Sequence, residues 1–242
     1  MCCYPFFSNV SAFGSITHRG VTETSLKIIA DFAQEELESG DDANDNEKIR
    51  FSKFYDKQYW DLLIEYCEMP DIDEIQGGFK VHFYNPATDK NFMWEDDSAL
   101  SRFKNHFEAA VKHYRDGDAE LAFQKLGRAV HFLEDLNTPV HTVYENPKDA
   151  IMKLPMHMQF EKKCDQIQDE CTAKIIMKSL AYFEVNRLES IGKASAVLSS
   201  ENFYNLSKAG ESKEFLIARR SVLNAQKKVV GVFYRFFKKA TA

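Results

Sequence analysis

Apolar residues recur at intervals of three and four along most of this chain, whereas the alternation typical of a β-strand is almost absent. Four segments carry the helical pattern most clearly: residues 50–67, 98–114, 118–136 and 212–239. Thr22 is placed to cap an earlier helix, and another long helix is expected to begin near Pro155 or Met156. Residues 190–211 are rich in Ser and are expected to form a loop. The sequence therefore predicts an all-α fold, a single compact multi-helix domain without internal repeats.

Composition limits the function classes that this chain can serve. It has 242 residues and a formal net charge of −6, from 31 Lys and Arg against 37 Asp and Glu. This balance argues against a clamp for nucleic acid that depends on bulk positive charge. The five Cys include no Cys-x-x-Cys pair, which argues against a disulfide scaffold and against a zinc site made of thiolates.

The N-terminal segment has two interpretations. Val10-Ser11-Ala12 has the small side chains of a signal-peptidase site, and cleavage there would release a chain that begins at Phe13. The alternative is a disordered tail that is retained. In either case residues 1–12 are expected to lie outside the domain, which then comprises residues 13–242.

Two pairs of His and acidic residues share one spacing. Asp135 follows His131 by four residues, and Glu161 follows His157 by the same number. Residues four apart lie on one face of a helix, so each pair is able to hold a cation between its two side chains. A proline turn then delivers His141 beyond the first pair, where it is able to face the second. The sequence predicts a metal site at this point.

The alternative to a metal site is a set of surface ion pairs. An isolated His and acid of this spacing usually form a surface ion pair. His106 and His113 stand among charged residues and are expected at the surface. His131 differs, because the residues around it at 129–133 are apolar and predict that it and Asp135 point inward. A buried carboxylate needs a cation or hydrogen-bond donors, which favours the metal site.

These residues belong to longer motifs that resemble the bacterial zinc-dependent phospholipase C family, which includes the catalytic domain of the alpha-toxins. The central motif is His131-Phe-Leu-Glu-Asp135-Leu-Asn-Thr-Pro139-Val-His141, followed by His157-Met-Gln-Phe-Glu161. Upstream, Thr17-His18, Pro70-Asp71 and His82-Phe83-Tyr84-Asn85-Pro86 match further family elements in the same order. Asn85 stands where the family usually has Asp.

The resemblance implies a centre of up to three Zn²⁺ ions. The ligand sets that it implies are Asp71, His82, His131 and Asp135 for one ion, His141, His157 and Glu161 for a second, and His18, Asp135 and the amino-terminal residue, here Phe13, for the third. The family commonly has Trp at that terminus, and no Trp precedes His18 in this sequence.

The resemblance also implies an activity, the hydrolysis of phospholipids to diacylglycerol and a phosphorylated headgroup. Asp71 would be the general base, and Phe79 would contact the headgroup. Ile72 stands where well-known members have an aromatic residue, which weakens the case for a choline headgroup. The expected partner is a phospholipid at a membrane surface and not a nucleic acid, and the protein is expected to be a secreted or periplasmic monomer.

Two other functions stay open at this point. Zinc-dependent single-strand nucleases share the fold and most of the ligand types, but they usually carry Asp where Glu161 stands. A non-catalytic interaction module stabilised by metal is the second. The last helix, which carries Val229, Phe233 and Phe236, is expected to close the core, and the alternative is contact with a bilayer.

Overall fold

The computed structural model describes residues 15–37, 50–51, 54–75, 79–206 and 211–242. In these ranges the chain forms helices and connecting turns, with no strand beyond an isolated bridge between Asn85 and Lys90. The all-α prediction is therefore confirmed for the described residues. None of the described helices combines the length and the apolar character that crossing a bilayer requires.

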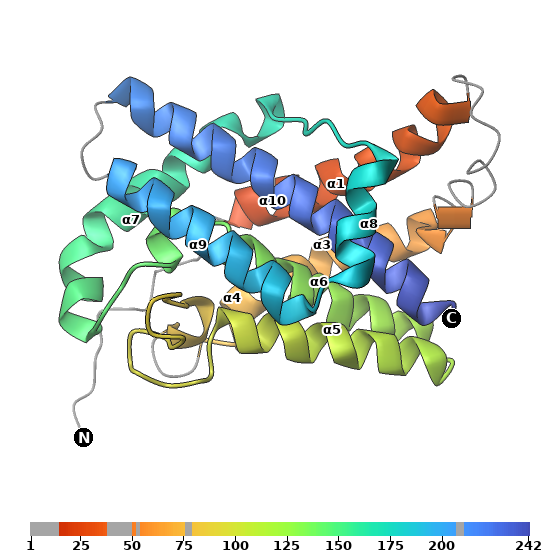
Figure 1. Ribbon diagram of the computed structural model, residues 1–242, viewed down its shortest axis with the longest axis horizontal. Helices are drawn as coiled ribbons and strands as arrows, with labels where there is room; N and C mark the ends of the chain where they lie inside the picture. Colours follow the sequence, from red (N-terminus) through yellow and green to blue (C-terminus); the bar gives the residue numbers. More distant parts are fainter. Residues whose placement is uncertain (1–14, 38–49, 52–53, 76–78, 207–210) are drawn as a thin grey trace.

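The longest helix, α10 (Glu211–Ala240), runs along the whole molecule and organises the fold (Figure 1). It packs against six other helices: α1 (Ser15–Leu37), α5 (Ala99–Arg115), α6 (Ala119–Asp135), α7 (Pro147–Ile167), α8 (Met177–Val185) and α9 (Leu188–Leu206). Its apolar side chains, among them Val229, Phe233 and Phe236, are fully or almost fully buried. The prediction that this helix closes the core is confirmed.

Helices α5 and α6 form an antiparallel pair joined at Gly117, and α3 (Lys57–Glu68) packs on the other side of α6. Gly117 has a φ of 89°, a left-handed conformation that glycine adopts without strain. Asp118 caps α6 by accepting a hydrogen bond from the backbone N–H of Leu121. Both helices agree with their predicted ranges to within a residue or two.

The connection between α3 and α5 is irregular. It contains the short helices α4 (Pro70–Asp73) and η2 (Lys80–His82), and the chain folds back on itself between Asn85 and Lys90. Asn side chains hold the backbone of this connection in place. Asn91, for example, accepts hydrogen bonds from the backbone N–H groups of Met93 and Glu95.

Several predicted boundaries are wrong. Thr22 does not cap a helix: α1 begins at Ser15, and Thr22 lies inside it with its hydroxyl bonded to a buried carboxylate. Helix α7 begins at Pro147, capped by Asn146, and Pro155 lies within it. The segment predicted to run unbroken over 50–67 is interrupted before α3, whose first backbone N–H is bonded by Asp56.

The Ser-rich segment is the largest correction, because it forms helix α9 instead of a loop. Ser195 is buried in this helix, and its hydroxyl donates to the carbonyl of Ile191 one turn earlier. Gly192 has no side chain to displace Leu100 and Leu136, whose methyl groups would lie 2.5 and 3.1 Å from an added Cβ. The small residues thus allow a close contact with neighbouring helices, which outweighs their low helix propensity.

Candidate metal centre

Three elements deliver the central motif to one place. His131 and Asp135 lie one turn apart at the end of α6, and both are fully buried. The helix ends there, and the 3₁₀ turn η3 (Pro139–His141) brings His141 back toward it. Helix α7 supplies His157 and Glu161, again one turn apart and buried. Each pair thus lies on one face of its helix, as its spacing predicts.

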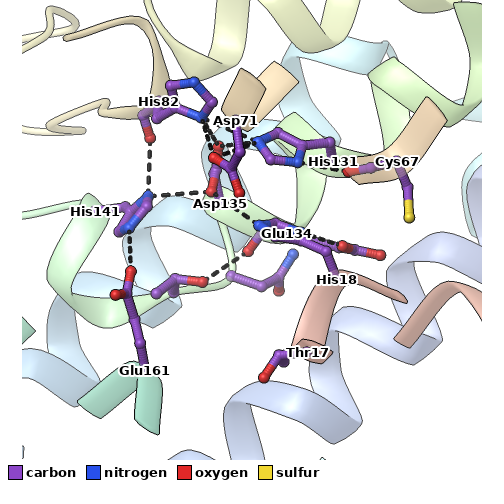
Figure 2. Close-up of polar contacts among 12 residues, drawn as sticks. Thr17, His18, Cys67, Asp71, His82, His131, Glu134, Asp135, His141 and Glu161 are labelled. Carbon is purple, nitrogen blue, oxygen red and sulfur yellow. Dashed lines mark hydrogen bonds and ion pairs between the residues drawn. The ribbon is translucent and has the colours of Figure 1, made fainter. Parts of the chain in front are cut away.

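The first group consists of His82, His131 and Asp135, with Asp71 beside them (Figure 2). His82 Nδ1 lies 3.0 Å from His131 Nε2 and 3.1 Å from Asp135 Oδ2, and the last two atoms are 3.4 Å apart. Asp71 Oδ1 lies 3.6 Å from both ring nitrogens. Four ligand atoms thus surround one point.

These separations are those expected of zinc ligands. Zinc bonds to nitrogen and oxygen are about 2.0–2.1 Å long, so the corners of a tetrahedral site lie about 3.3 Å apart. In addition, His82 Nε2 is buried without a hydrogen-bond partner among the described residues, so its ring is not held by an alternative polar contact. Imidazole and carboxylate together suit zinc. The residues therefore fit the ion.

The second group consists of His141, His157 and Glu161. His141 Nε2 lies 3.2 Å from His157 Nε2 and 3.4 Å from Glu161 Oε1, and the last two atoms are 2.5 Å apart. Two imidazole nitrogens and one carboxylate oxygen leave a fourth tetrahedral position open. Three protein ligands with one open position are typical of a catalytic zinc site.

The third group forms around His18 on α1. Its ring stacks on that of His131 at 4.0 Å, and its Nε2 lies 3.7 Å from Asp135 Oδ1. Asp71 and His131 also offer atoms within reach of His18, so the structure adds Asp71 to this neighbourhood. Phe13, which the resemblance implies as a further ligand, lies outside the described residues, as does the segment 1–12.

Four of the five histidines present Nε2 to the ligand cluster and have a polar partner at Nδ1, an arrangement that fixes the ring and its tautomer. In His141 this Nδ1 also lies 3.1 Å from Asp135 Oδ1. The partners are Glu134 Oε2 for His18 (2.5 Å), the carbonyl of Cys67 for His131 (2.7 Å), the carbonyl of His82 for His141 (3.1 Å) and the hydroxyl of Tyr144 for His157 (3.1 Å).

Glu134 and Tyr144 contact the candidate ligands His18 and His157, and the sequence analysis does not single out either residue. Glu134 is fully buried, and Thr22 donates a hydrogen bond to its second oxygen at 3.1 Å. Burial raises the pKa of this carboxyl well above its usual range. A signal was available, because Glu134 stands next to Asp135 in an otherwise apolar stretch, where an acid has no reason to be unless it meets a partner.

The centre concentrates opposing charges away from water. Burial alone would raise the pKa of the Asp135 carboxyl, but the neighbouring His131 and His141 outweigh this and hold it well below its usual range. Burial likewise opposes charge on His141, yet Asp135 and Glu161 raise its pKa to about 10. Burial and the nearby His18 lower the pKa of His131. In the metal-free protein, the positive charge beside the Asp135 carboxylate is therefore that of protonated His141.

The remaining predicted residues lie on the irregular connection. Asp71 sits on α4, and its neighbour Ile72 is exposed. Phe79 precedes η2 in a left-handed conformation, with φ of 61°, and its ring centroid lies 5.8 Å from that of His82. His106 differs from its prediction as a surface residue: it is largely buried, stacks on Phe132 and lies 2.9 Å from a carboxylate oxygen of Glu74.

Several bacterial phospholipases C are similar to this chain in sequence. Phospholipases C of Clostridium novyi and Clostridium perfringens are each 25% identical to it, over 92% and 93% of this chain and 58% and 59% of their own lengths. A phospholipase C of Listeria monocytogenes is 34% identical over 91 residues, which cover 37% of this chain and 30% of that protein. The chain thus spans less than two thirds of these relatives.

Solved structures and a family model agree with the sequence relatives. The alpha toxin of Clostridium absonum superposes with a TM-score of 0.76 at 22% identity, over 95% of this chain and 65% of that one. Clostridium perfringens alpha-toxin gives a TM-score of 0.73 with the same identity and coverage. These likenesses show the fold. The family model described as zinc dependent phospholipase C matches residues 27–210, and on this evidence the chain belongs to the zinc-dependent phospholipase C family.

Proposed function

We propose that this protein is a zinc-dependent phosphodiester hydrolase, a phospholipase C that cleaves the glycerol-side P–O bond and releases diacylglycerol and a phosphorylated headgroup. The observation that carries the proposal is the convergence of eight His, Asp and Glu side chains from six elements, α1, α4, η2, α6, η3 and α7, on a single buried cluster. A purely structural role would not need so many buried ligands in contact with one another.

The residues divide the work according to their positions. Bound zinc lowers the pKa of a coordinated water toward 7 and polarises phosphoryl oxygens. His82, His131 and Asp135 hold one ion, and His141, His157 and Glu161 hold a second. Of the first group, Asp71 alone has an exposed side-chain fraction, 7% against 0% for the other three. This access supports Asp71 as the general base that takes the proton from the attacking water at a carboxylate oxygen.

Two further assignments belong to this proposal. Phe79 is assigned to the headgroup, since an aromatic ring near His82 is able to attract a choline cation. The free amine of Phe13 is assigned to the third ion, which places the mature terminus after residue 12 and the protein in the secreted or periplasmic space. The position of His18 near the start of α1 supports this, because it lies only five residues after Phe13. A mass spectrum of the exported protein that retains residues 1–12 would contradict it.

The first experiment measures phosphocholine release from phosphatidylcholine by zinc-loaded protein that begins at Phe13. Release that a chelator abolishes and zinc restores is expected. Asp71→Asn is expected to lose at least about 100-fold in turnover, the usual contribution of a general base. Asp61→Asn, an exposed control on α3, is expected to retain full turnover.

Two outcomes would overturn the proposal. Absence of release from every phospholipid class by folded, zinc-replete protein would remove the phospholipase assignment, and cleavage of single-stranded DNA by the same sample would replace it with the nuclease. Full turnover of Asp71→Asn with normal zinc content would remove Asp71 from the role of general base.

A further inference from the structure

A cavity of about 670 Å³ lies between the segment at 171–176 and helices α8, α9 and α10. Its volume falls in the range of small-molecule sites, roughly 300–1,000 Å³. None of the residues in the three metal groups lines it, so it is separate from the centre described above. Figure 1 shows α8 and α9 each lying against α10.

The walls of the cavity are apolar side chains that water reaches. Ile176 is 64% exposed, Leu198 41% and Tyr182 39%, although all three are large and apolar or aromatic. The ring of Phe183 is buried behind them. Apolar side chains that converge on a concave surface mark a binding site more often than isolated exposed ones do.

Three lysines, and no acidic residue, complete the lining. Lys174 comes from the extended segment, and Lys227 and Lys228 come from α10. Lys228 is half-buried, with its ammonium 5.4 Å and 5.6 Å from the ring centroids of Tyr182 and Phe183. Burial lowers its pKa, and no ion pair joins any of the three lysines to a carboxylate within the described ranges. In a chain of net charge −6 this is a local reversal of sign.

Hydrogen bonds to α10 hold the cavity in shape at both ends of its rim. At one end, Gln226 donates to the carbonyl of Cys171 at 2.8 Å and accepts from the backbone N–H of Ala173 at 2.9 Å. At the other end, Arg235 donates to the carbonyls of Phe183 and Asn186, at 2.5 and 2.7 Å, and so holds the C-terminus of α8. A binding surface that is held in place before binding loses less entropy when a ligand arrives.

Gly231 lies beneath the ring of Phe183, which lines the cavity. A Cβ at this position would lie 2.3 Å from ring atoms of Phe183, so the ring packs directly on the backbone of α10. This contact brings α8 close to α10 and places Tyr182 beside Lys228. The apolar walls and the ammonium group therefore face the same space.

We infer that this cavity binds a single-chain amphiphile with an acidic headgroup, of the fatty-acid anion type. The chain lies along Ile176, Tyr182 and Leu198, and the carboxylate meets Lys228 with Lys174 and Lys227 nearby. An anion here would compensate a half-buried ammonium that now meets two aromatic rings, and apolar burial would supply most of the affinity. The inference does not depend on the proposed function, since no ligand of the metal groups takes part.

Calorimetric titration of the full chain, zinc-loaded, with dodecanoate below its micelle concentration tests the inference. One dodecanoate is expected to bind per protein. Butyrate shares the carboxylate and dodecyltrimethylammonium shares the chain, and each is expected to bind at least about tenfold more weakly. Lys228→Gln is expected to weaken dodecanoate binding by about tenfold, while Lys178→Gln, on α8 but outside the lining, leaves it unchanged.

A second pair of variants locates the site independently. Leu198→Glu places a negative charge in the wall and is expected to abolish binding, whereas Val197→Glu, equally exposed but outside the lining, is expected to keep it. Circular dichroism checks that the four variants fold. Absence of dodecanoate binding, equal binding of the cationic amphiphile, or binding that Lys228→Gln and Leu198→Glu leave unchanged would overturn the inference, and the last result would place the carboxylate at the metal centre instead.

Discussion

Glu134 does for His18 what a backbone carbonyl does for His131, because each accepts the proton on Nδ1 and turns Nε2 toward the ligand cluster. The two hydrogen-bond acceptors differ in whether a substitution is able to remove them. The carbonyl of Cys67 is present whatever its side chain, whereas the orientation of His18 depends on a single buried carboxylate. The third group is thus open to loss by a substitution outside the ligands themselves, as the second group is through Tyr144.

Replacing Glu134 by Ala is expected to weaken the binding of one zinc ion by about 10–100-fold, the usual effect of losing a group that orients a ligand. Metal content after dialysis at limiting free zinc measures this. Glu134→Gln keeps an acceptor for His18 and is expected to recover part of the loss. Glu120→Ala, at an exposed site on the same helix, is the control. Equal zinc content in all of these proteins would show that Glu134 does not orient His18.

Glu74 is a largely buried carboxylate outside the three metal groups, and it anchors the segment that carries Asp71. It accepts from Arg102 at 2.8 Å and from Arg128 at 2.7 Å, and it meets His106 at 2.9 Å. Burial alone would raise the pKa of the Glu74 carboxyl, but the hydrogen bond with His106 and the two arginines outweigh it and lower that pKa to about 2. These three contacts join α4 to α5 and α6.

Because the folded-state pKa of Glu74 is depressed, its contribution to stability is present above about pH 4.5 and is lost as the pH falls toward 2. Glu74→Gln is expected to lower the free energy of unfolding at pH 7 by about 2 kcal/mol, and the difference from the wild type is expected to shrink as the pH falls through this range. Urea denaturation between pH 7 and pH 2.5 measures it. Glu65→Gln, exposed on α3, is the control. A difference that does not change with pH would contradict the assignment.

At the scale of elements, the contact between α3 and α6 is set by Gly127. A Cβ there would lie 2.9 Å from the carbonyl oxygen of Leu63 and 3.0 Å from Cβ of Tyr66. The nearest atom belongs to the backbone, so relief requires that one helix move relative to the other. Helix α6 ends in His131 and Asp135, and a shift of this helix therefore reaches the metal centre.

Gly127→Ala is accordingly expected to destabilise the protein by about 1–3 kcal/mol, although Ala is the better helix former. It is also expected to weaken zinc binding. Weaker binding would show that α6 has moved together with His131 and Asp135, whereas local crowding at Gly127 would lower stability alone. Thermal unfolding and zinc titration measure the two effects. Gln124→Ala, one turn earlier on α6, is expected to change neither. A stabilised Gly127→Ala protein would show that the two helices separate without cost.

The elements that could be predicted are those whose periodicity is uninterrupted. Helices α5, α6 and α10 have long apolar faces and agree with their expected ranges. Helix α9 could not be predicted in this way, because its stability comes from close packing at Gly192 and Ser195, which propensity does not register. The start of α7 could not be predicted either, because a proline usually marks the first turn of a helix and Pro155 lies inside this one. A helix tolerates an internal proline when the lost hydrogen bond and the bend are accommodated.

The positions of the candidate ligands could be predicted from the sequence, whereas the residues that orient these ligands could not. Ligands recur at intervals that a helix turns into one face, so the positions of His131, Asp135, His157 and Glu161 follow from spacing alone. The residues that orient them come from places with no fixed distance along the chain, such as Tyr144 behind His157. The tertiary fold creates these contacts, and a single sequence holds little trace of them.

At the scale of the whole molecule, zinc binding is coupled to the loss of protons from the ligands of the metal centre. In the metal-free protein Asp135 and Glu161 raise the pKa of His141 to about 10, so His141 is protonated at neutral pH and must lose that proton before it binds zinc. Zinc binding is therefore expected to release protons and to weaken steadily as the pH falls from 9 to 6. Calorimetric titration in buffers of different ionisation enthalpy counts the protons. An uptake of zinc without proton release would contradict the raised pKa.

Asp135 gives the centre one more property. Its Oδ2 faces His82 and His131, while its Oδ1 lies 3.1 Å from His141 Nδ1 and 3.7 Å from His18 Nε2. The same carboxylate thus stands at the border of every group, and an ion that fixes one oxygen also fixes the other. An ion bound to one oxygen would therefore restrict the orientation of the other, and the occupancies of the neighbouring groups are expected to be coupled through Asp135.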